Sequence, residues 1–183
     1  FKQKTAYEML RSLVGSEMCI RDRSKCVSCE ACEVQCKVHH DLPVGPNLCQ
    51  IQRLSPEESS DPLDENFVFM SCFHCDEAAC LDVCPTTAIR RREKDGIVHI
   101  EPVLCIGCTS CMSACAWGAI QWNPETKKAT KCDHCMDRLD EGLKPSCVTV
   151  CLTSCLDYVP EEELPPGISK YIVTANGHPE VIK

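Results

Sequence analysis

Sixteen of the 19 cysteines in this 183-residue chain fall into four groups of four, in which most neighbours are separated by two or three residues. The pattern C-x2-C-x2-C, followed by a fourth cysteine after three more residues, is typical of cubane 4Fe-4S clusters, which transfer single electrons. In chain order the groups are Cys26, Cys29, Cys32 and Cys36; Cys72, Cys75, Cys80 and Cys84; Cys105, Cys108, Cys111 and Cys115; and Cys132, Cys135, Cys147 and Cys151.

The spacing also indicates how these cysteines share clusters. The first three cysteines of a motif bend the backbone around one cubane, while the fourth ends a short helix and, in two-cluster ferredoxins, ligates the other cluster. The second motif is expanded by two residues between Cys75 and Cys80, and eleven residues separate Cys135 from Cys147 in the fourth. We therefore expect ligands to cross over between paired motifs.

Disulfides and zinc are the other common uses of closely spaced cysteines. A disulfide framework is disfavoured because the total is odd and near neighbours in a motif could not bridge each other without strain. A zinc site usually takes two C-x2-C pairs and does not need three cysteines within seven residues. A zinc-stabilised binding module is the alternative from another functional class.

The composition agrees with a core built on clusters. Aromatic residues are 5% of the chain, and the hydrophobic fraction of 44% includes the cysteines. The apolar core that these residues can form is too small to offset the conformational entropy lost on folding. We therefore expect the clusters to hold the fold together. The net charge of -8 disfavours nucleic acid as a partner. No apolar run approaches the roughly 18 residues that cross a bilayer, so no direct membrane insertion is expected.

Short elements must position the motifs. An internal repeat is formed by segments 84–89, 115–120 and 151–156. In each segment we expect a cysteine that ends a short helix, then a turn, then the start of a strand. Asp95-Gly96 predicts a β-hairpin between 88–91 and 97–100, and 123–126 predicts a second turn. Helices are expected at 30–40, 78–84, 110–115 and 134–139.

The expected fold class is α+β, a duplicated bacterial-ferredoxin-like fold wrapped around four clusters. The four-cluster domain covers 24–159, with an inner two-cluster unit at 67–122 nested in an outer unit made of 24–54 and 129–159. Residues 1–23 are predicted to be non-native or disordered, because 11–23 resemble a translated sequencing adapter; a helical extension is the alternative. The tail, 160–183, is expected to cover a partner or the surface.

With all four motifs in order, the chain resembles the four-cluster ferredoxin-type subunit of the dimethyl sulfoxide reductase family, which includes relatives in formate dehydrogenase and polysulfide reductase. The resemblance spans about 24–159. It implies that the first motif pairs with the fourth and the second with the third. The implied ligand sets are Cys26, Cys29, Cys32 and Cys151; Cys132, Cys135, Cys147 and Cys36; Cys72, Cys75, Cys80 and Cys115; and Cys105, Cys108, Cys111 and Cys84. The chain departs from the family in lacking proline after Cys115 and Cys151, which is expected to alter potentials more than cluster binding.

The resemblance also implies a non-catalytic subunit that relays single electrons in anaerobic respiration. The implied partners are a molybdopterin-containing catalytic subunit at one end and a membrane quinone-reactive subunit or a soluble acceptor at the other. A stand-alone polyferredoxin for a hydrogenase or carbon monoxide dehydrogenase is an alternative. The compartment is left open, with the cytoplasm favoured and co-export to the periplasm with a partner as the other route.

The other candidate residues are assigned to packing or the surface. Cys155 occupies the repeat position of Ala88 and Ala119 and, like Cys49, is expected to be a small buried residue. Histidines at 74 and 134 lie between two ligands and are expected to pack around the clusters. His39 and His40 are expected to be solvated, and Lys131 and Arg138 either tune a cluster by charge or lie at the surface.

The first prediction concerns metal content. Protein purified without oxygen should be brown, with broad absorption at about 400 nm and about four irons for each group of four cysteines. Absorption spectroscopy and metal analysis make the measurement. A colourless protein that contains zinc would contradict the iron-sulfur interpretation.

Overall fold

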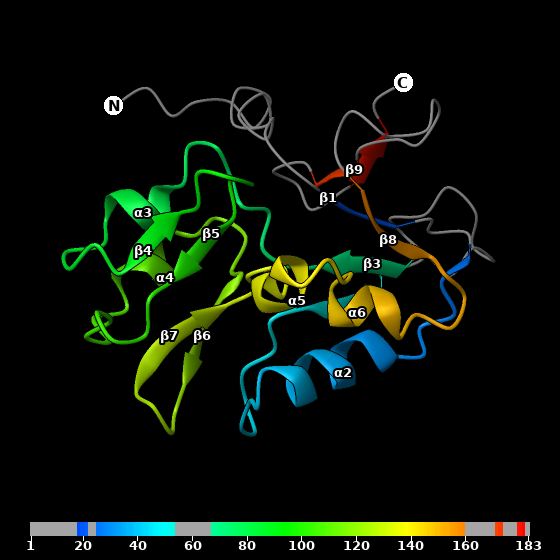
Figure 1. The fold of residues 1–183 in the computed structure, drawn as a ribbon, viewed down its shortest axis with the longest axis horizontal. Helices are drawn as coiled ribbons and strands as arrows, with labels where there is room; N and C mark the ends of the chain where they lie inside the picture. Colours follow the sequence, from blue (N-terminus) through cyan, green and yellow to red (C-terminus); the bar gives the residue numbers. More distant parts are fainter. Residues whose placement is uncertain (1–17, 22–24, 54–66, 160–170, 174–178, 182–183) are drawn as a thin grey trace.

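The computed structural model describes residues 18–21, 25–53, 67–159, 171–173 and 179–181. Within these ranges the chain forms short helices and two-stranded antiparallel sheets, and these gather into two halves side by side (Figure 1). One half is formed by the middle of the chain. The other combines segments from before and after it. Both halves contain short helices and antiparallel strand pairs, so the fold class is α+β with ferredoxin-type elements.

The first half contains two helix-hairpin units. In each, a short helix is followed by a turn and a β-hairpin, and the two helices pack against each other. The elements of this half are α3 (Ala79–Asp82), β4 (Ile89–Arg91), β5 (Val98–Ile100), α4 (Ser110–Ala114), β6 (Ile120–Asn123) and β7 (Lys128–Lys131).

Both predicted hairpins are confirmed. Ile89 faces Ile100 across the first hairpin, and Ile120 faces Lys131 across the second. Asp95 closes the first turn by accepting the backbone N–H of Ile97, and Gly96 has the positive φ, 66°, that this kind of turn needs. The hairpins of this half therefore follow from their turn residues.

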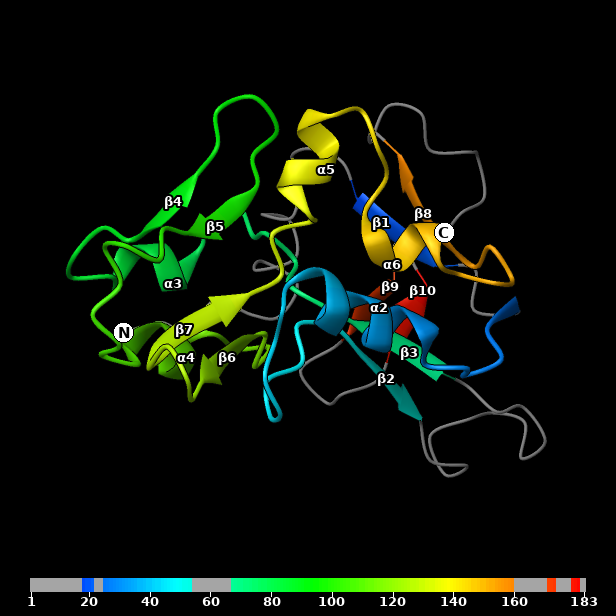
Figure 2. The ribbon, with the colours of Figure 1, turned by 60° about the horizontal axis from the view of Figure 1, so that its bottom comes forward.

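The second half is built from segments far apart in the sequence. Helix α2 packs against α6, and β1 pairs with β8, as Figure 2 shows from a turned view. Its elements are β1 (Met18–Arg21), α2 (Ala31–His39), β2 (Gln50–Arg53), β3 (Phe67–Met70), α5 (Met136–Asp140), α6 (Ser146–Thr149) and β8 (Leu156–Val159). A separate hairpin joins β9 (Tyr171–Val173) and β10 (Pro179–Val181).

Strand pairing crosses the predicted unit boundaries at both edges. Strand β3, which begins at the predicted start of the inner unit, pairs with β2 of the outer segment. Strand β7, most of which falls in the predicted outer segment, completes the inner hairpin with β6. Of the predicted N-terminal segment, 1–23, only β1 is described, and of the predicted tail, 160–183, only β9 and β10 are. The remainder of both lies outside the described residues, and these domain assignments stay predictions.

The apolar cores are small and contain cysteines. The first half buries Ile89, Val98 and Ile120 around Cys111. The second half buries two sets, which contain Cys32 or Cys36 together with the aliphatic and aromatic side chains Val148, Leu156, Tyr158 and Leu48. Because cysteines stand where other folds place large aliphatic side chains, the cores continue directly into the cysteine motifs.

A glycine in the third motif gives a test of this packing. Gly107 has a φ of 71°, and a Cβ there would overlap the backbone oxygen of Lys127 in the β6–β7 turn. Gly118 has a φ of 61° but open space around it. We expect Gly107→Ala to lower stability by about 3 kcal/mol and Gly118→Ala by only about 1 kcal/mol. The measurement is the temperature at which absorption at about 400 nm is lost without oxygen; equal losses in the two variants would contradict the overlap.

Candidate iron-sulfur centres

The third motif surrounds a cavity of about 340 Å³ together with one cysteine of the second motif. The loop before α4 contributes Cys105 and Cys108, α4 contributes Cys111, and the segment just beyond α3 contributes Cys84. Apolar side chains, including Ile89, cover the remaining walls. A cavity bordered by four sulfurs and apolar groups fits a cluster that is held by thiolates and shielded from water.

The same arrangement occurs twice in the second half. One cavity of about 340 Å³ is lined by three cysteines of the first motif, one of the fourth and Cys155. Another of about 360 Å³ is lined by three cysteines of the fourth motif, one of the first and Cys49. The first of these cavities has Cys26, Cys29, Cys32 and Cys151, and the second has Cys132, Cys135, Cys147 and Cys36. All three cavities are close in volume.

The four remaining motif cysteines are linked by their electrostatic effects on each other. Burial raises the pKa of Cys75, and the neighbouring thiolates of Cys72 and Cys115 raise it further. Burial also raises the pKa of Cys80 to about 11; Lys131 opposes this, while Cys72 and Cys115 add to it. Cys115, just beyond α4, therefore lies with the three cysteines that begin the second motif.

We call each set a cage and number it by the motif that supplies three of its cysteines. Cage 1 is Cys26, Cys29, Cys32 and Cys151; cage 2 is Cys72, Cys75, Cys80 and Cys115; cage 3 is Cys105, Cys108, Cys111 and Cys84; cage 4 is Cys132, Cys135, Cys147 and Cys36. The structure thus brings twelve of the sixteen predicted residues together around three cavities and places the other four near one another. Their role as iron ligands stays a prediction.

Burial dominates the acidity of several cage thiols. It raises the pKa of Cys32 to about 12, with a contribution from Cys147, and that of Cys135 to about 12 as well. The pKa of Cys132 is also well above the usual value, first because of burial. Such thiols stay protonated near neutral pH unless a cation lies in the cage, because metal binding releases the proton. The cages are therefore suited to a cationic iron centre.

The four motif loops share one backbone feature. The residue before the second cysteine of each motif has a positive φ: 51° at Ser28, 47° at His74, 71° at Gly107 and 57° at His134. In the second and fourth motifs, the same residue also directs its backbone N–H at sulfur. The N–H of His74 lies 3.4 Å from Sγ of Cys72, and that of His134 lies 3.5 Å from Sγ of Cys132. These loops therefore aim hydrogen-bond donors at the thiolates as they bend around the cavity.

Two of the three cysteines outside the motifs are described with their side chains, and both are buried, as expected for packing residues. Cys155 is 5% exposed at the repeat position where Ala88 is 1% exposed, and its Sγ lies 3.4 Å from Sγ of Cys151. Cys49 is 3% exposed and donates its S–H to the backbone oxygen of Cys32 at 3.6 Å. Cys19 lies in β1, and its side chain is outside the described residues.

Two histidines and a lysine fill the boundary between the halves. The rings of His74 and His134 lie with their centroids 3.9 Å apart, and burial is the main cause that lowers the pKa of both, to about 3 for His134. Nδ1 of His74 accepts the backbone N–H of Val98 at 3.0 Å. Lys131 is 5% exposed and donates to the backbone oxygens of Val98 and Cys132. The surface position considered for Lys131 is therefore wrong.

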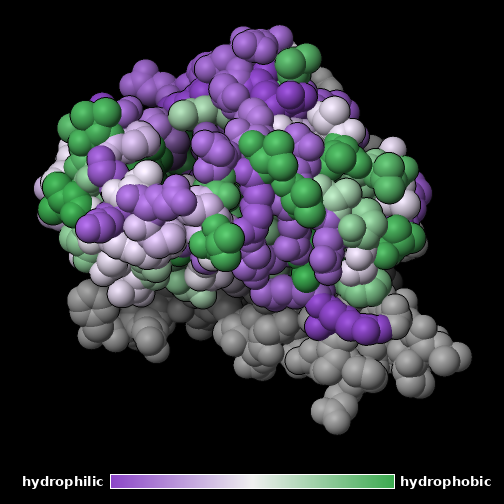
Figure 3. All heavy atoms as spheres, turned by 90° about the horizontal axis from the view of Figure 1, so that it is seen from below, coloured by the Kyte–Doolittle hydropathy of each residue, from purple (hydrophilic) through white to green (hydrophobic). Residues whose placement is uncertain are grey.

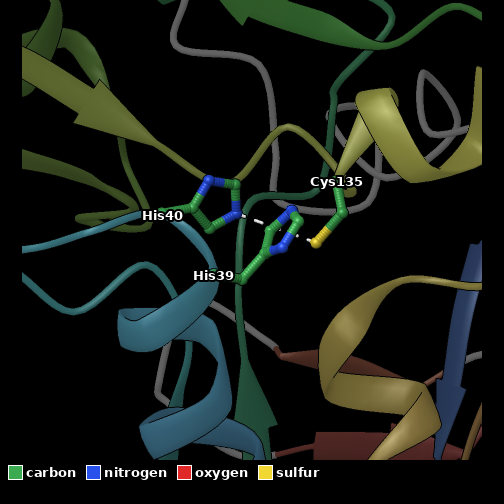
Figure 4. A group of neighbouring side chains, drawn as sticks. All are labelled: His39, His40 and Cys135. Atoms are coloured by element: carbon green, nitrogen blue, oxygen red, sulfur yellow. Dashed lines mark hydrogen bonds between the residues drawn. The ribbon is translucent and has the colours of Figure 1, made fainter.

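The expectation that His40 is solvated is also wrong. Its side chain is 17% exposed and lines the cavity of cage 4, where Nε2 lies 3.7 Å from Sγ of Cys135 (Figure 4). The same expectation is wrong for His39, whose side chain is 18% exposed and contacts the exposed carboxylate of Asp137 at 3.2 Å. Sequence reasoning missed His40 because its role depends on where the end of α2 meets the fourth motif. The available signal was its spacing of four residues from Cys36, which places both on one helix face.

Comparisons with known proteins agree with the cages. The family of the 4Fe-4S dicluster domain matches residues 63–161. The thiosulfate reductase electron transfer subunit PhsB of Salmonella typhi is 40% identical over 151 residues, covering 81% of this chain and 78% of that protein. This protein belongs to the family of iron-sulfur electron-transfer subunits of molybdopterin oxidoreductases.

Two further relatives of this electron-transfer subunit have similar coverage. An anaerobic dimethyl sulfoxide reductase subunit of Escherichia coli strain K12 is 39% identical over 150 residues, covering 78% of this chain and 73% of that protein. The probable anaerobic dimethyl sulfoxide reductase chain YnfG of the same strain is 40% identical over 153 residues, with the same two coverages. The predictions of an electron relay and of a non-catalytic subunit are confirmed by this membership.

The residues of this electron-transfer subunit bind and shield, and they transform no substrate. A bound 4Fe-4S cluster supplies reversible one-electron chemistry. The cage cysteines would hold it, the apolar walls would exclude water, and the backbone N–H groups near sulfur would stabilise negative charge. Among the described residues, no helix has both the length and the apolar character that a membrane span requires.

A prediction at Cys155 separates packing from ligation. Cys155→Ala should leave the iron content and the EPR spectrum of the reduced protein unchanged, because alanine fits the equivalent position at Ala88. The matched variant Cys151→Ala should lose iron. If Cys155→Ala loses as much iron as Cys151→Ala, Cys155 is a ligand and the packing assignment is wrong.

Proposed function

We propose that each of the four cages holds one 4Fe-4S cluster, so that the chain relays single electrons through four clusters. The observation that supports this is the make-up of the sets, each with three cysteines of one motif and one of another. Cages 2 and 3 exchange Cys115 and Cys84, and cages 1 and 4 exchange Cys151 and Cys36. Two nested two-cluster units of this kind correspond to a duplicated ferredoxin-like fold.

The electron route in this proposal runs from cage 3 through cage 2 and cage 4 to cage 1. Neighbours within a unit share a helix end. Between the units, the pKa of Cys132 is raised first by burial and next by the thiolate of Cys72. These two cysteines are therefore close, so cages 2 and 4 are adjacent. Cys147 likewise acts on Cys32, which links cage 4 to cage 1. A linear order leaves cages 1 and 3 at the two ends.

The two end cages reach the surface. Cys29 of cage 1 and Cys108 of cage 3 are exposed, and each has an exposed apolar residue in the same cavity lining, Val27 at 63% and Ile106 at 67%. Seen from below, the hydrophobic side chains form separate patches rather than one surface (Figure 3). We propose that a molybdopterin-containing catalytic subunit docks at one end and a membrane quinone-reactive subunit at the other, because apolar side chains in a polar rim are typical of interfaces.

The exchange of ligands between cages gives the decisive test. Cys36→Ala should remove the same reduced-state EPR signal as Cys132→Ala, because both belong to cage 4. Cys151→Ala should remove the same signal as Cys29→Ala, because both belong to cage 1. The measurement is EPR of each variant, reduced without oxygen, together with its iron content.

The paired variants also serve as controls for each other. Loss of the Cys29 signal in Cys36→Ala would show that the first motif builds its own cluster, which would contradict the exchange. Four clusters further require that single variants in cages 2 and 3 remove two other signals.

A further inference from the structure

His40 is placed beside the sulfurs of cage 4 by the same helix that delivers one of its cysteines. Cys36 lies inside α2, and His40 follows four residues later, directly after the last helical residue. One helical turn separates the two, so both side chains project from the same face. Both line the cavity of about 360 Å³ with the three fourth-motif cysteines.

The contacts of His40 fix which ring nitrogen carries hydrogen. Nε2 lies 3.7 Å from Sγ of Cys135 and 3.6 Å from Oδ1 of Asp133 (Figure 4 shows the ring and the sulfur). Oδ1 of Asp133 also accepts the backbone N–H of Cys135 at 2.9 Å. Once Cys135 is a thiolate, Nε2 faces only acceptors, so a ring with hydrogen on Nε2 suits the position.

The ring is held in this place by its neighbours. His39 lies edge to face with it, with centroids 4.8 Å apart and planes at 80°. Asp133 holds the backbone of Cys135 and faces the ring at the same time. The Asp133 carboxylate therefore lies between the His40 ring and the backbone of Cys135 and relates their positions.

We propose that His40 donates a hydrogen bond from Nε2 to Sγ of Cys135 and thereby raises the reduction potential of the cage 4 cluster. This rests on the proposed function, in which cage 4 holds a 4Fe-4S cluster. Reduction adds one negative charge that is shared with the thiolate sulfurs. A donor beside sulfur stabilises the reduced state more than the oxidised state, so the potential rises.

The effect should be specific to cage 4. The described residues that line the cavities of cages 1 and 3 include no histidine. Of cages 1 and 4, only cage 4 has imidazoles in the described lining of its cavity, those of His40 and His134, and only His40 has a ring nitrogen in a hydrogen-bond contact with a cage sulfur. His40 would therefore separate the potentials of two otherwise similar neighbours along the electron route.

The experiment is an EPR-monitored redox titration of the purified full chain with its clusters in place. His40→Leu, which has no donor, should shift one midpoint to lower potential and leave the other three unchanged. The shifted signal should be the one that Cys132→Ala removes. His40→Gln keeps an N–H donor and should stay closer to the unsubstituted protein. The comparison variant, His39→Leu, should shift this midpoint less than His40→Leu, because His39 contacts Asp137 and the His40 ring but makes no hydrogen bond to sulfur.

The outcomes separate this proposal from the proposed function. Unchanged or higher midpoints in a His40→Leu protein that contains all its clusters would overturn the role of His40 alone. Equal shifts in His39→Leu and His40→Leu would also overturn it, because the cause would then not be the sulfur contact. Loss of the cage 4 cluster in both His40→Leu and His40→Gln would overturn it as well and assign His40 to cluster assembly instead. A chain that holds no 4Fe-4S cluster would refute the proposed function itself.

Discussion

The fourth cysteine of each motif lies at or near the end of a short helix and faces the three cysteines of another motif. This exchange constrains the rest of the chain. Helix α2 must lie on α6 so that Cys36 and Cys151 reach opposite cages, and α3 must lie on α4 for Cys84 and Cys115. Buried thiols with raised pKa values lose their protons and become thiolate ligands only when a cation lies between them. The metal therefore takes the place of much of the missing apolar core.

The boundary between the halves is polar and hydrogen-bonded, not an apolar interface. The carbonyl oxygen of Val98, in the first half, accepts a hydrogen bond from Nζ of Lys131. The backbone N–H of Val98 donates to Nδ1 of His74. Lys131 also donates to the carbonyl of Cys132, and the tilted rings of His74 and His134 contact each other across the boundary. These contacts hold cages 2 and 4 at a fixed separation. The buried ammonium group of Lys131 lies beside both cages. It would stabilise the negative charge that an added electron brings to a cluster in cage 2 or cage 4.

Local signals in the sequence were sufficient for much of this structure. Asp95-Gly96 specified its hairpin, and the recurring cysteines specified α2 and α4 to within one residue at each end. Helix α5 begins two residues later than expected because His134 and Cys135 both adopt positive φ. The internal repeat predicted a helix ending at Cys151, which is α6, but gave no start for it. The pairing of β2 with β3 was missed, since no turn signature lies between them. The contact between His40 and Cys135 joins residues 95 apart in sequence, and only the packing of α2 against the fourth motif creates it.

The central claim is that every cage combines three cysteines of one motif with one of another around a single cluster. The most direct measurement is a crystal structure of the protein purified without oxygen, with anomalous diffraction recorded at the iron edge. The account predicts iron density at the centre of four sets, joined to Cys151, Cys115, Cys84 and Cys36 as the exchanged ligands. Iron density bound by the four cysteines of one motif alone, or fewer than four iron centres, would contradict it.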